Sequence, residues 1–540
     1  MLFSNLFMAL SFLGTVQADD APTGESPPAP EKPQPESPAP DKPETETPPE
    51  PTQSAAASPE AEAPAPGPEK RTFQTSGEMR FIGNIFPDFP VDNEGSMVGQ
   101  CRVLDQRLRA AAELQMPSWK METEWDLFSG QLVGDTWDIP DRADERHRER
   151  LSVVHPDSFR ARKAKMSGRV GPVLLEGGIT TSHWGLGMVA NDGAHDPHFG
   201  RADFGDRVLR LRVVTMPLAQ KDVPLYLVVA GDRVIADDMA RWSEDQAAYQ
   251  GITSLLWRHP EGHQAGIYGV YRLQNEADGE RQTRAKMVDV FVETFGGLGS
   301  TDWDWLAGME AAGIAGTTDR SLSYNEREAL RIRSAGTTGY IGARGLDDNL
   351  SLLLRGGWAS GDGNSDDDTV NDFSFDRDFD VGMVMYPEFW GAIEAGTHAL
   401  LSDPEHGGQA PDGVDAVTTE GAFRRASFVQ PVIDYQVHEW VNLRTGMVWS
   451  WATAPIAHPF ISYRNGGIAT NHLGEETEGY ELGSEFDWAV TIGDQSRDTR
   501  VGTITPALVA QGGHLFLSEN LAKTDDDVLS LWLLTGRVRW

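Results

Sequence analysis

YELGSEFDWAVTIG, residues 480–493, alternates between two kinds of side chain. One set is mostly apolar and aromatic: Tyr480, Leu482, Ser484, Phe486, Trp488, Val490 and Ile492. The other set is small or acidic and includes Glu481, Glu485 and Asp487. A helix of this sequence would scatter the three acids around its circumference, whereas a strand places them on one face. The stretch therefore predicts a β-strand of about ten residues or more, with one apolar and one polar face, as in a membrane-spanning barrel.

The same alternation recurs along the chain. Residues 439–451 repeat it, and they follow 427–437 after the short connection His438-Glu439, which predicts a hairpin with a tight turn. Further predicted strands are 207–215, 224–235, 287–294, 329–333 and 349–358. Polar stretches rich in Gly, Asp, Asn and Ser separate them, at 191–206, 236–248, 360–380, 402–422 and 463–478. These stretches predict long loops.

Residues 528–540, VLSLWLLTGRVRW, predict a further strand. Trp532, Leu534, Val538 and Trp540 share its apolar face, and Arg537 and Arg539 share the other. A closing strand that ends in an outward aromatic residue is typical of bacterial outer-membrane barrels. We therefore expect Trp540 to act as an assembly signal, and a soluble β-sandwich is the alternative.

The N-terminal region differs from the rest in composition. Residues 1–18 are apolar and end in Val16-Gln17-Ala18, which predicts a signal peptide. Residues 19–76 are dominated by Pro, Ala, Glu, Ser and Thr, which predicts a disordered linker that builds no core. Residues 77–540 are expected to form the folded part.

The fold class that follows is all-β: a single transmembrane antiparallel β-barrel over 77–540, preceded by the disordered Pro-rich segment. No stretch of 77–540 has the run of about 18 apolar residues that a membrane helix requires. The length accommodates an even number of roughly 16–18 strands, with both termini periplasmic. Such a barrel is too wide for side chains to fill, so it encloses water unless it is plugged. Residues 141–165 and 385–399 fit strands poorly, and either segment could fold inward.

Charge and cysteine content exclude several classes. The net charge of −36 argues against nucleic acid as a partner. The single cysteine, Cys101, excludes a disulfide within the chain and a cysteine metal cluster.

The charged residues on the predicted polar faces are candidates for lining the pore. They are Arg210, Arg212, Arg331, Arg333, Arg444, Glu481, Glu485, Arg537 and Arg539. Rings of charge in a pore set ion preference, so the arginines can form a selectivity ladder. They can equally pair with wall acids and only solvate the wall, and the sequence favours neither interpretation.

No metal, cofactor or catalytic site is predicted. Asp362, Asn364, Asp366 and Asp368 have calcium-loop spacing, but Asp367 and Phe373 stand where an EF-hand needs Gly and Glu, so a solvated acidic loop is expected. His195-Asp196-Pro197-His198 lacks a second ligand cluster and is read as loop. No hydrolase, metalloprotease or nucleotide-binding motif occurs in a suitable context.

Two motifs resemble those of alginate-export-type outer-membrane barrels. His183-Trp184-Gly185-Leu186-Gly187 resembles their WGxG stretch, and residues 354–364 resemble their strand leading into an ASGDxN loop. Phe373, Phe375 and Phe379 and then Val381-Gly382 follow the second motif, as in that family. A related group of secreted barrels is similar at Trp184–Met188 and Asn191–Gly193. The resemblance implies a porin-like barrel whose lumen is lined by basic residues.

The function expected from these observations is an outer-membrane channel, in a Gram-negative-type bacterium, that passes polar or anionic solutes, carbohydrates among them. The alternatives are a structural or adhesive surface barrel with partner-binding loops and a barrel enzyme, although we expect no enzymatic activity. Expected partners are outer-membrane lipid and lipopolysaccharide, the barrel-assembly machinery and the polar solute. The oligomeric state is left open.

Overall fold

The computed structural model describes residues 71–92, 97, 101–134, 159–202, 205–277, 279, 281–299, 301–320, 329–363, 367–394, 421–456, 458, 461, 468, 470–477, 479–493, 504–521 and 528–540. All of these belong to one compact unit, Ala55–Trp540. The predicted signal peptide (1–18) and residues 19–70 of the predicted linker lie outside the described residues. The first strand begins at Thr72, so residues 72–76, which were assigned to the linker, belong to the barrel.

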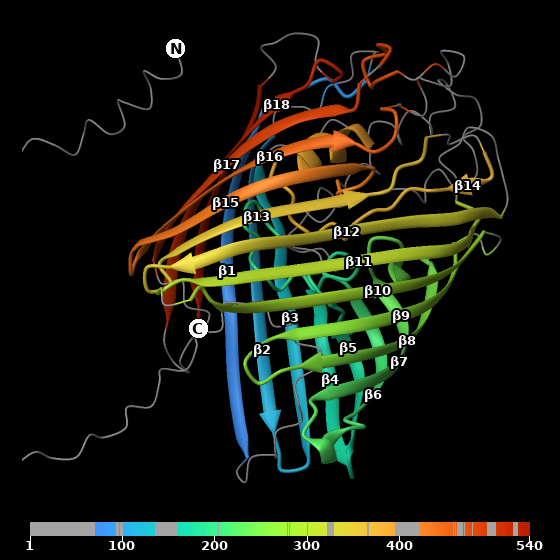
Figure 1. The fold of residues 1–540 in the computed structure, drawn as a ribbon, viewed down its shortest axis with the longest axis vertical. Helices are drawn as coiled ribbons and strands as arrows, with labels where there is room; N and C mark the ends of the chain where they lie inside the picture. Colours follow the sequence, from blue (N-terminus) through green and yellow to red (C-terminus); the bar gives the residue numbers. More distant parts are fainter. Residues whose placement is uncertain are drawn as a thin grey trace, which may run out of the picture. The chain divides into compact units, whose positions relative to one another are not determined.

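One sheet contains all the strands of the described residues (Figure 1). They are β1 (Thr72–Phe86), β2 (Cys101–Gln115), β3 (Trp119–Gly134), β4 (Phe159–Val170), β5 (Val173–Thr181), β6 (Arg207–Thr215), β7 (Leu225–Ala236), β8 (Ala247–Arg258), β9 (Gln264–Asn275), β10 (Gln282–Gly297), β11 (Asp304–Thr318), β12 (Leu330–Gly345), β13 (Leu350–Ala359), β14 (Thr369–Val370), β15 (Ala426–His438), β16 (Val441–Ala452), β17 (Glu481–Gly493), β18 (Thr505–Leu517) and β19 (Val528–Arg539). Short helical segments are η3 (Ala219–Lys221), η4 (Trp242–Glu244) and the π-helix η5 (Met385–Trp390). None of the helices described is long and apolar enough to cross a membrane.

The sheet closes on itself. Strand β1 pairs antiparallel with β2 on one side and with β19 on the other, with Glu78 opposite Arg539. The two-residue strand β14 pairs parallel with the start of β12 and lies outside this cycle. The remaining eighteen strands form a closed antiparallel β-barrel. The predicted fold class and the predicted even strand number near 16–18 are confirmed.

The connections differ in length between the two ends of the barrel. At the short-turn end, where β1 begins and β19 finishes, strands are joined by turns such as 116–118, 171–172 and 439–440. At the long-connection end they are joined by segments such as 182–206, 360–425 and 453–480. The turn at 439–440 confirms the predicted hairpin, displaced by one residue. Periplasmic turns of such barrels are short and extracellular loops long, so both barrel termini lie on the periplasmic side.

The outer face of the barrel is apolar. Along β6 the exposed side chains Leu209, Leu211 and Val213 alternate with the buried Val208, Arg210, Arg212 and Val214. The same alternation in β10 leaves Val288, Val290 and Val292 exposed. A continuous apolar band around a closed antiparallel barrel is stable only against hydrocarbon. The described part of the chain is therefore an outer-membrane barrel whose polar faces point inward.

Leu211→Arg tests this orientation. Leu211 is 73% exposed at the middle of β6, so the guanidinium would enter lipid and lower the free energy of unfolding by about 2–4 kcal/mol. Phe73→Arg is the matched control, because Phe73 is 68% exposed but lies near the short-turn end of β1, where the penalty falls to about 0–1 kcal/mol. Denaturant titrations in lipid vesicles measure both. Equal penalties at the two positions would contradict the assignment.

Candidate functional site

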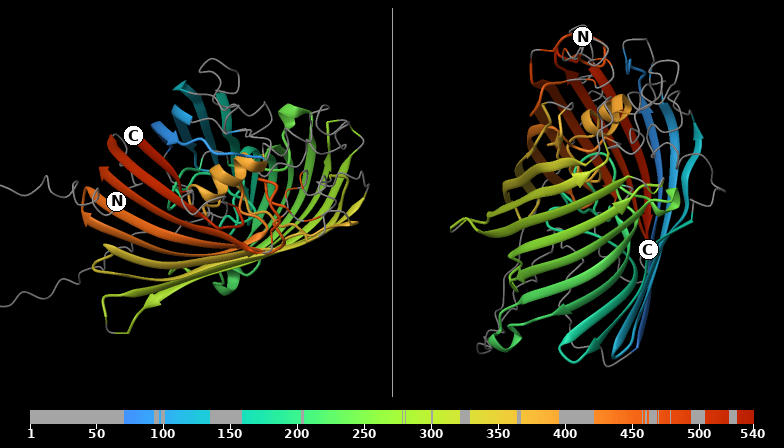
Figure 2. Two further views of the ribbon diagram at one scale, coloured as in Figure 1. Left: turned by 90° about the horizontal axis from the view of Figure 1, so that it is seen from above. Right: turned by 90° about the vertical axis from the view of Figure 1, so that its right-hand side faces the viewer.

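Described parts of two connections from the long-connection end fold into the barrel. The first inner loop comprises residues 182–202 and 205–206, between β5 and β6, and the second inner loop comprises residues 371–394 and 421–425, between β14 and β15. Phe199 of the first and Phe373 and Phe389 of the second are buried in one apolar core that includes the wall residue Leu531. Figure 2 shows η5, in orange, within the ring of strands. The interior of the described barrel is therefore narrowed by these two loops.

The structure shows where parts of the two segments that fit strands poorly, 141–165 and 385–399, lie. Residues 385–394 are helical, mostly buried and folded inward, which confirms one of the two expected outcomes for 385–399. Residues 395–399 lie outside the described residues. Of 141–165, residues 159–165 belong to β4, and the remainder is likewise not described.

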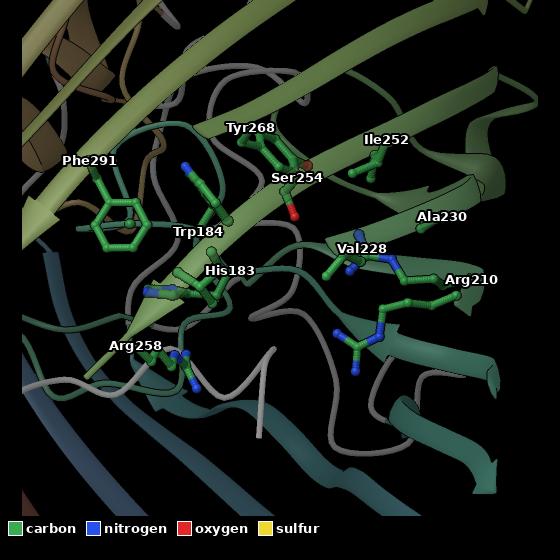
Figure 3. Close-up of a pocket in the computed structure, with 13 residues that line it drawn as sticks. His183, Trp184, Arg210, Val228, Ala230, Ile252, Ser254, Arg258, Tyr268 and Phe291 are labelled. Carbon is green, nitrogen blue, oxygen red and sulfur yellow. The ribbon is translucent and has the colours of Figure 1, made fainter. Parts of the chain in front are cut away.

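Trp184 anchors the first inner loop against the wall. Its ring stacks on Tyr268 at 4.8 Å between centroids and meets the edge of Phe291 at 5.0 Å. Its indole Nε1–H donates to the Asp289 carboxylate at 2.8 Å. Figure 3 shows His183 and Trp184 of the loop across from wall residues Arg210, Val228 and Tyr268. The aromatic residue of the Trp-Gly-Leu-Gly motif is thus a wall anchor.

The Glu310 carboxylate holds the next turn of the same loop. It accepts the backbone N–H of Leu186 and, at 3.5 Å, that of Met188. Gly185 has a φ of +56°, and a Cβ there would lie 2.6 Å from a Glu310 carboxylate oxygen. The first glycine of the motif is therefore required both by its backbone conformation and by the close approach of the wall acid.

A second wall carboxylate holds the second inner loop in the same way. Glu485 of β17 is completely buried and accepts the backbone N–H groups of Met383 at 2.6 Å, Val384 at 2.7 Å and Met385 at 2.7 Å. Gly382 precedes them with a φ of +71°, and a Cβ there would lie 2.8 Å from Glu485. In each inner loop, backbone N–H groups that follow a glycine turn thus donate to a buried wall acid. Converging N–H groups of this kind suit an anion.

The two inner loops also bind each other. Asp376 donates its backbone N–H to the Met188 carbonyl at 2.7 Å and accepts the Asn191 N–H at 3.0 Å through its carboxyl group. The Asp378 carboxylate accepts the Gly205 N–H at 2.6 Å. Burial, reinforced by the neighbouring Asp238 and Asp206, raises the pKa of Asp376 well above its usual range. The loops therefore form one docked assembly.

Arginines from three neighbouring wall strands gather around a tip of the first inner loop. Asp196 of the loop pairs with Arg80 of β1 at 2.8 Å and with Arg537 and Arg539 of β19 at 2.9 and 2.8 Å. The wall acid Glu78 pairs with Arg80, with Arg107 of β2 at 3.1 Å and with Arg539 at 2.8 Å. We call these six residues the arginine cluster. It holds four guanidinium groups and two carboxylates.

Other inward basic residues have carboxylate partners on adjacent strands. Arg210 pairs with Asp232 at 2.7 Å and Arg212 pairs with Glu176 at 3.1 Å. Further pairs between adjacent strands are Arg109–Asp126, Arg162–Glu124 and Lys165–Glu176, and Arg355 of β13 pairs with Asp380 of the second inner loop. Each of these basic residues therefore has a carboxylate partner, whereas the arginines of the cluster share two carboxylates among four guanidinium groups.

Six of the nine candidate pore-lining residues lie on the inner face: Arg210, Arg212, Arg444, Glu485, Arg537 and Arg539. Their roles differ. Arg444 pairs with Asp434 at 2.5 Å and donates to the His198 carbonyl at 2.9 Å, so it helps to hold the first inner loop. Glu485 is a loop clamp, with no exposed surface. Whether any of the six governs conduction remains a prediction.

The expected placement of the other three residues is wrong. Arg331 and Arg333 lie on the outer face near the long-connection end of β12, where Arg331 is half-exposed and pairs with Asp368 at 2.6 Å. An arginine is tolerated outside the barrel there because the strand end lies beyond the hydrocarbon. Glu481 is exposed because a β-bulge between Glu481 and Gly483 turns Leu482 inward in its place. One inserted residue reverses the faces on either side of it.

Trp540 lies on the outer face, as its position in the alternation predicts. Its backbone exchanges two hydrogen bonds with Gly77, of 3.0 and 3.1 Å, and its ring covers the Gly77 backbone. A role as an assembly signal stays a prediction.

The sequence carried signals for residues that were not singled out. Glu78 and Arg80 alternate with Met79 and Phe81 in the first strand, in the same pattern that identified Arg537 and Arg539. Glu310 interrupts a strand of mainly small and apolar residues, which marks it as an inward acid. No local pattern, however, indicates that Asp196 meets the cluster or that Glu310 meets Leu186.

The two stretches that were weighed as metal-binding sequences are residues 362–368 and 195–198. Within each stretch, the described side chains turn toward different partners. Asp362 accepts the Asn371 N–H at 3.1 Å and Asp368 pairs with Arg331, whereas Asn364 and Asp366 lie outside the described residues. In the run from His195 to His198, Asp196 enters the arginine cluster and His198 faces Asp380 at 3.2 Å. His195 turns the other way, toward His183.

No protein-family model and no curated protein matches the chain. Similar solved structures are outer-membrane proteins. Acinetobacter baumannii OccAB1 is 10% identical, with 86% of this chain and 96% of that chain covered and a TM-score of 0.48. Pseudomonas aeruginosa OccK2 (OpdF) is 11% identical, with 87% and 97% covered and a TM-score of 0.47. Pseudomonas aeruginosa OprD is 10% identical, with 86% and 94% covered and a TM-score of 0.48. The names of these structures include no alginate exporter, and the part of that expectation that the structure confirms is the closed antiparallel β-barrel.

Proposed function

We propose that the barrel is a channel for polar solutes that bear a carboxylate, with the arginine cluster as the element that attracts them. The single observation that supports this proposal is the charge of the cluster. Four guanidinium groups share two carboxylates, so the six residues of the cluster carry a formal charge of +2. Arginine remains charged at any physiological pH and its planar donors match a carboxylate.

The cluster stands out because the rest of the molecule has the opposite sign. The chain has a net charge of −36, and inward arginines elsewhere on the wall, such as Arg109, Arg210 and Arg212, each face a carboxylate. A local field inside a narrow, low-dielectric passage acts on permeating ions more strongly than distant surface charge, which salt screens within about 8–10 Å. On this proposal the inner loops select for anionic solutes although the protein as a whole is acidic.

Reversal potentials in planar bilayers under a salt gradient test the proposal. Arg80→Gln combined with Arg537→Gln removes the local positive excess and is expected to shift the reversal potential toward cation preference. Arg331→Gln is the matched control, because it removes an arginine from the outer face. An unchanged reversal potential in the double variant would show that the cluster only solvates the wall.

Solute entry into vesicles extends the test to the substrate class. Glucuronate and glucose have similar size and differ in one carboxylate, so the wild-type protein is expected to admit glucuronate faster. The double variant is expected to lose most of this difference. Equal entry of the two sugars through the wild-type protein would contradict the proposal.

A second candidate function is a structural or adhesive barrel with a closed interior. The observation that favours it is the apolar core between the inner loops and the wall, in which Phe199, Phe373 and Phe389 are buried. This alternative requires that no ion conductance be measured in bilayers. The same recordings therefore decide between the two.

Membrane assembly is a separate part of the proposal. We infer that Trp540, on the outer face beside Gly77, contributes to recognition by the barrel-assembly machinery. Aromatic side chains of this kind lie in the interfacial belt of outer-membrane barrels. Lipopolysaccharide, as the outer lipid, would contact the long-connection end.

A further inference from the structure

The fold of the first inner loop brings two histidines and an aspartate together. The His183 and His195 rings lie 5.0 Å apart between centroids, inclined at 41°. The Asp192 Oδ1 atom is 3.7 Å from His183 Nδ1 and 3.5 Å from His195 Nδ1. One ligand atom of each residue lies within 4.8 Å of the others. The sequence did not suggest this group, because His183 is twelve residues away from His195 along the loop.

The spacing matches that of ligands around a metal ion better than that of hydrogen-bonded groups. Distances of 3.5 and 3.7 Å exceed the usual range for a hydrogen bond between nitrogen and oxygen, which ends at about 3.2 Å. Two ligand atoms on a tetrahedral zinc ion, with bonds of about 2.0–2.2 Å, lie about 3.3–3.6 Å apart. The three ligand atoms lie within 4.8 Å of one another, so the imidazoles would move inward to complete that geometry.

Asp192 supplies an independent observation. Its side chain is almost completely buried, and its Oδ2 atom has no hydrogen-bond partner among the described residues. A buried carboxylate oxygen without a partner is costly unless a cation satisfies it.

The surrounding charges permit a dication. Arg162 donates to the Asp192 carbonyl, but its guanidinium is paired with Glu124 at 2.8 Å. Glu293 of the wall adds a further carboxylate within electrostatic range of His195. The side chain of His195 is 24% exposed, whereas His183 and Asp192 are buried. An ion can therefore enter from the His195 side, where one coordination position stays open to water.

The loop presents the three residues from a rigid framework. Trp184, next to His183, is fixed by Asp289, and the Asn191 N–H next to Asp192 is fixed by Asp376. The Ala194 N–H, next to His195, donates to Asp192 Oδ1 at 3.0 Å. Ligands that are already held in place lose little conformational entropy when a metal binds.

We propose that His183, Asp192 and His195 bind a divalent transition-metal ion, with Zn²⁺ as the ion that the ligand set suits best. Two imidazole nitrogens and a carboxylate oxygen, with one position for water, are a common zinc donor set. Bound metal links the start of the first inner loop, at His183, to its middle, at Asp192 and His195. His195 adjoins Asp196 of the arginine cluster in the chain, but none of the three proposed ligands belongs to the cluster, so the metal site does not depend on the channel function.

Isothermal titration of the refolded full-length protein with zinc chloride tests the site. We expect saturable binding that weakens at least about ten-fold in His195→Gln, because loss of a direct ligand should exceed the loss that follows from disturbing an outer partner. His438→Gln is the control, since His438 is an exposed residue of the short-turn end. Visible absorption of bound Co²⁺ gives a second readout, which should show a tetrahedral spectrum in the wild-type protein and lose it in His195→Gln.

A competing site requires its own variant. His259, Glu261 and His263 form another potential metal-binding group in the β8–β9 turn, where Glu261 is largely exposed. His263→Gln removes a ligand of this group and is expected to leave the tight binding intact. Binding that survives in both His195→Gln and Asp192→Asn but disappears in His263→Gln would overturn the proposal, and so would the absence of zinc binding in the wild-type protein. If Asp192→Asn fails to fold, the partly exposed His195 still carries the test.

Discussion

Glu485→Ala is expected to release the second inner loop and to raise the single-channel conductance. The substitution removes three charge-assisted hydrogen bonds to Met383, Val384 and Met385. Hydrogen bonds to charged groups contribute about 1.5–3 kcal/mol each, so a loss of only about 3 kcal/mol is a cautious figure for the set. That loss shifts the equilibrium between docked and undocked loop by roughly two orders of magnitude. Recordings should show larger and noisier currents.

The control for this prediction lies on the same strand. Glu481→Ala removes an exposed carboxylate beyond the bulge and should leave both conductance and noise unchanged. Heat-modifiable migration on gels establishes that both variants form the barrel. If Glu485→Ala conducts like the wild-type protein while its barrel is folded, then the second inner loop is held by its apolar core alone, and the clamp is not what keeps it docked.

Asp196→Asn is expected to increase anion selectivity. The carboxylate that bridges Arg80, Arg537 and Arg539 disappears, and the local positive excess of the arginine cluster rises from two charges to three. At an effective dielectric constant of about 40, one charge acts on an anion about 8 Å away with about 1 kcal/mol. This energy corresponds to a roughly five-fold higher ratio of anion to cation permeability. Reversal potentials measure the change.

The effect should depend on ionic strength and on position. It should shrink as salt increases, because counterions screen the cluster. Asp368→Asn provides the control, since Asp368 pairs with Arg331 on the outer face and should not alter selectivity. A shift of equal size in the control would mean that the overall charge of the protein, and not the cluster, sets the preference.

The alternation of side chains was sufficient to predict the barrel and six of its inward charged residues. Arg210, Arg212, Arg537 and Arg539 fall in the middle or at the periplasmic end of regular strands, where only one face can accept charge. The rule weakens where lipid no longer constrains the outer face, and so it failed for Arg331. It also failed for Glu481, because a single bulge residue reverses the register and leaves no sign in the composition.

The interior of the barrel could not be predicted in this way. Glu310 meets Leu186 across 124 positions of the chain, and Arg537 meets Asp196 across 341. Such contacts depend on the closed sheet, which brings distant strands around one space, and no local periodicity encodes them. The glycines of the Trp-Gly-Leu-Gly motif were visible, but their partner was not, because a lone acid in β11 has no sequence link to a loop after β5.

The contacts of Asp196 have a consequence for how the barrel is sealed. Arg80 belongs to β1 and Arg537 and Arg539 belong to β19, the two strands whose pairing closes the ring. Asp196 thus links β1 to β19 from inside the barrel, in addition to the backbone hydrogen bonds between these two strands. Closure of the barrel and docking of the first inner loop are thereby coupled thermodynamically. A barrel that pairs β1 with β19 before this loop has docked lacks the ion pairs that Asp196 makes to both strands. A force that separates β1 from β19 must also pull the loop away from them.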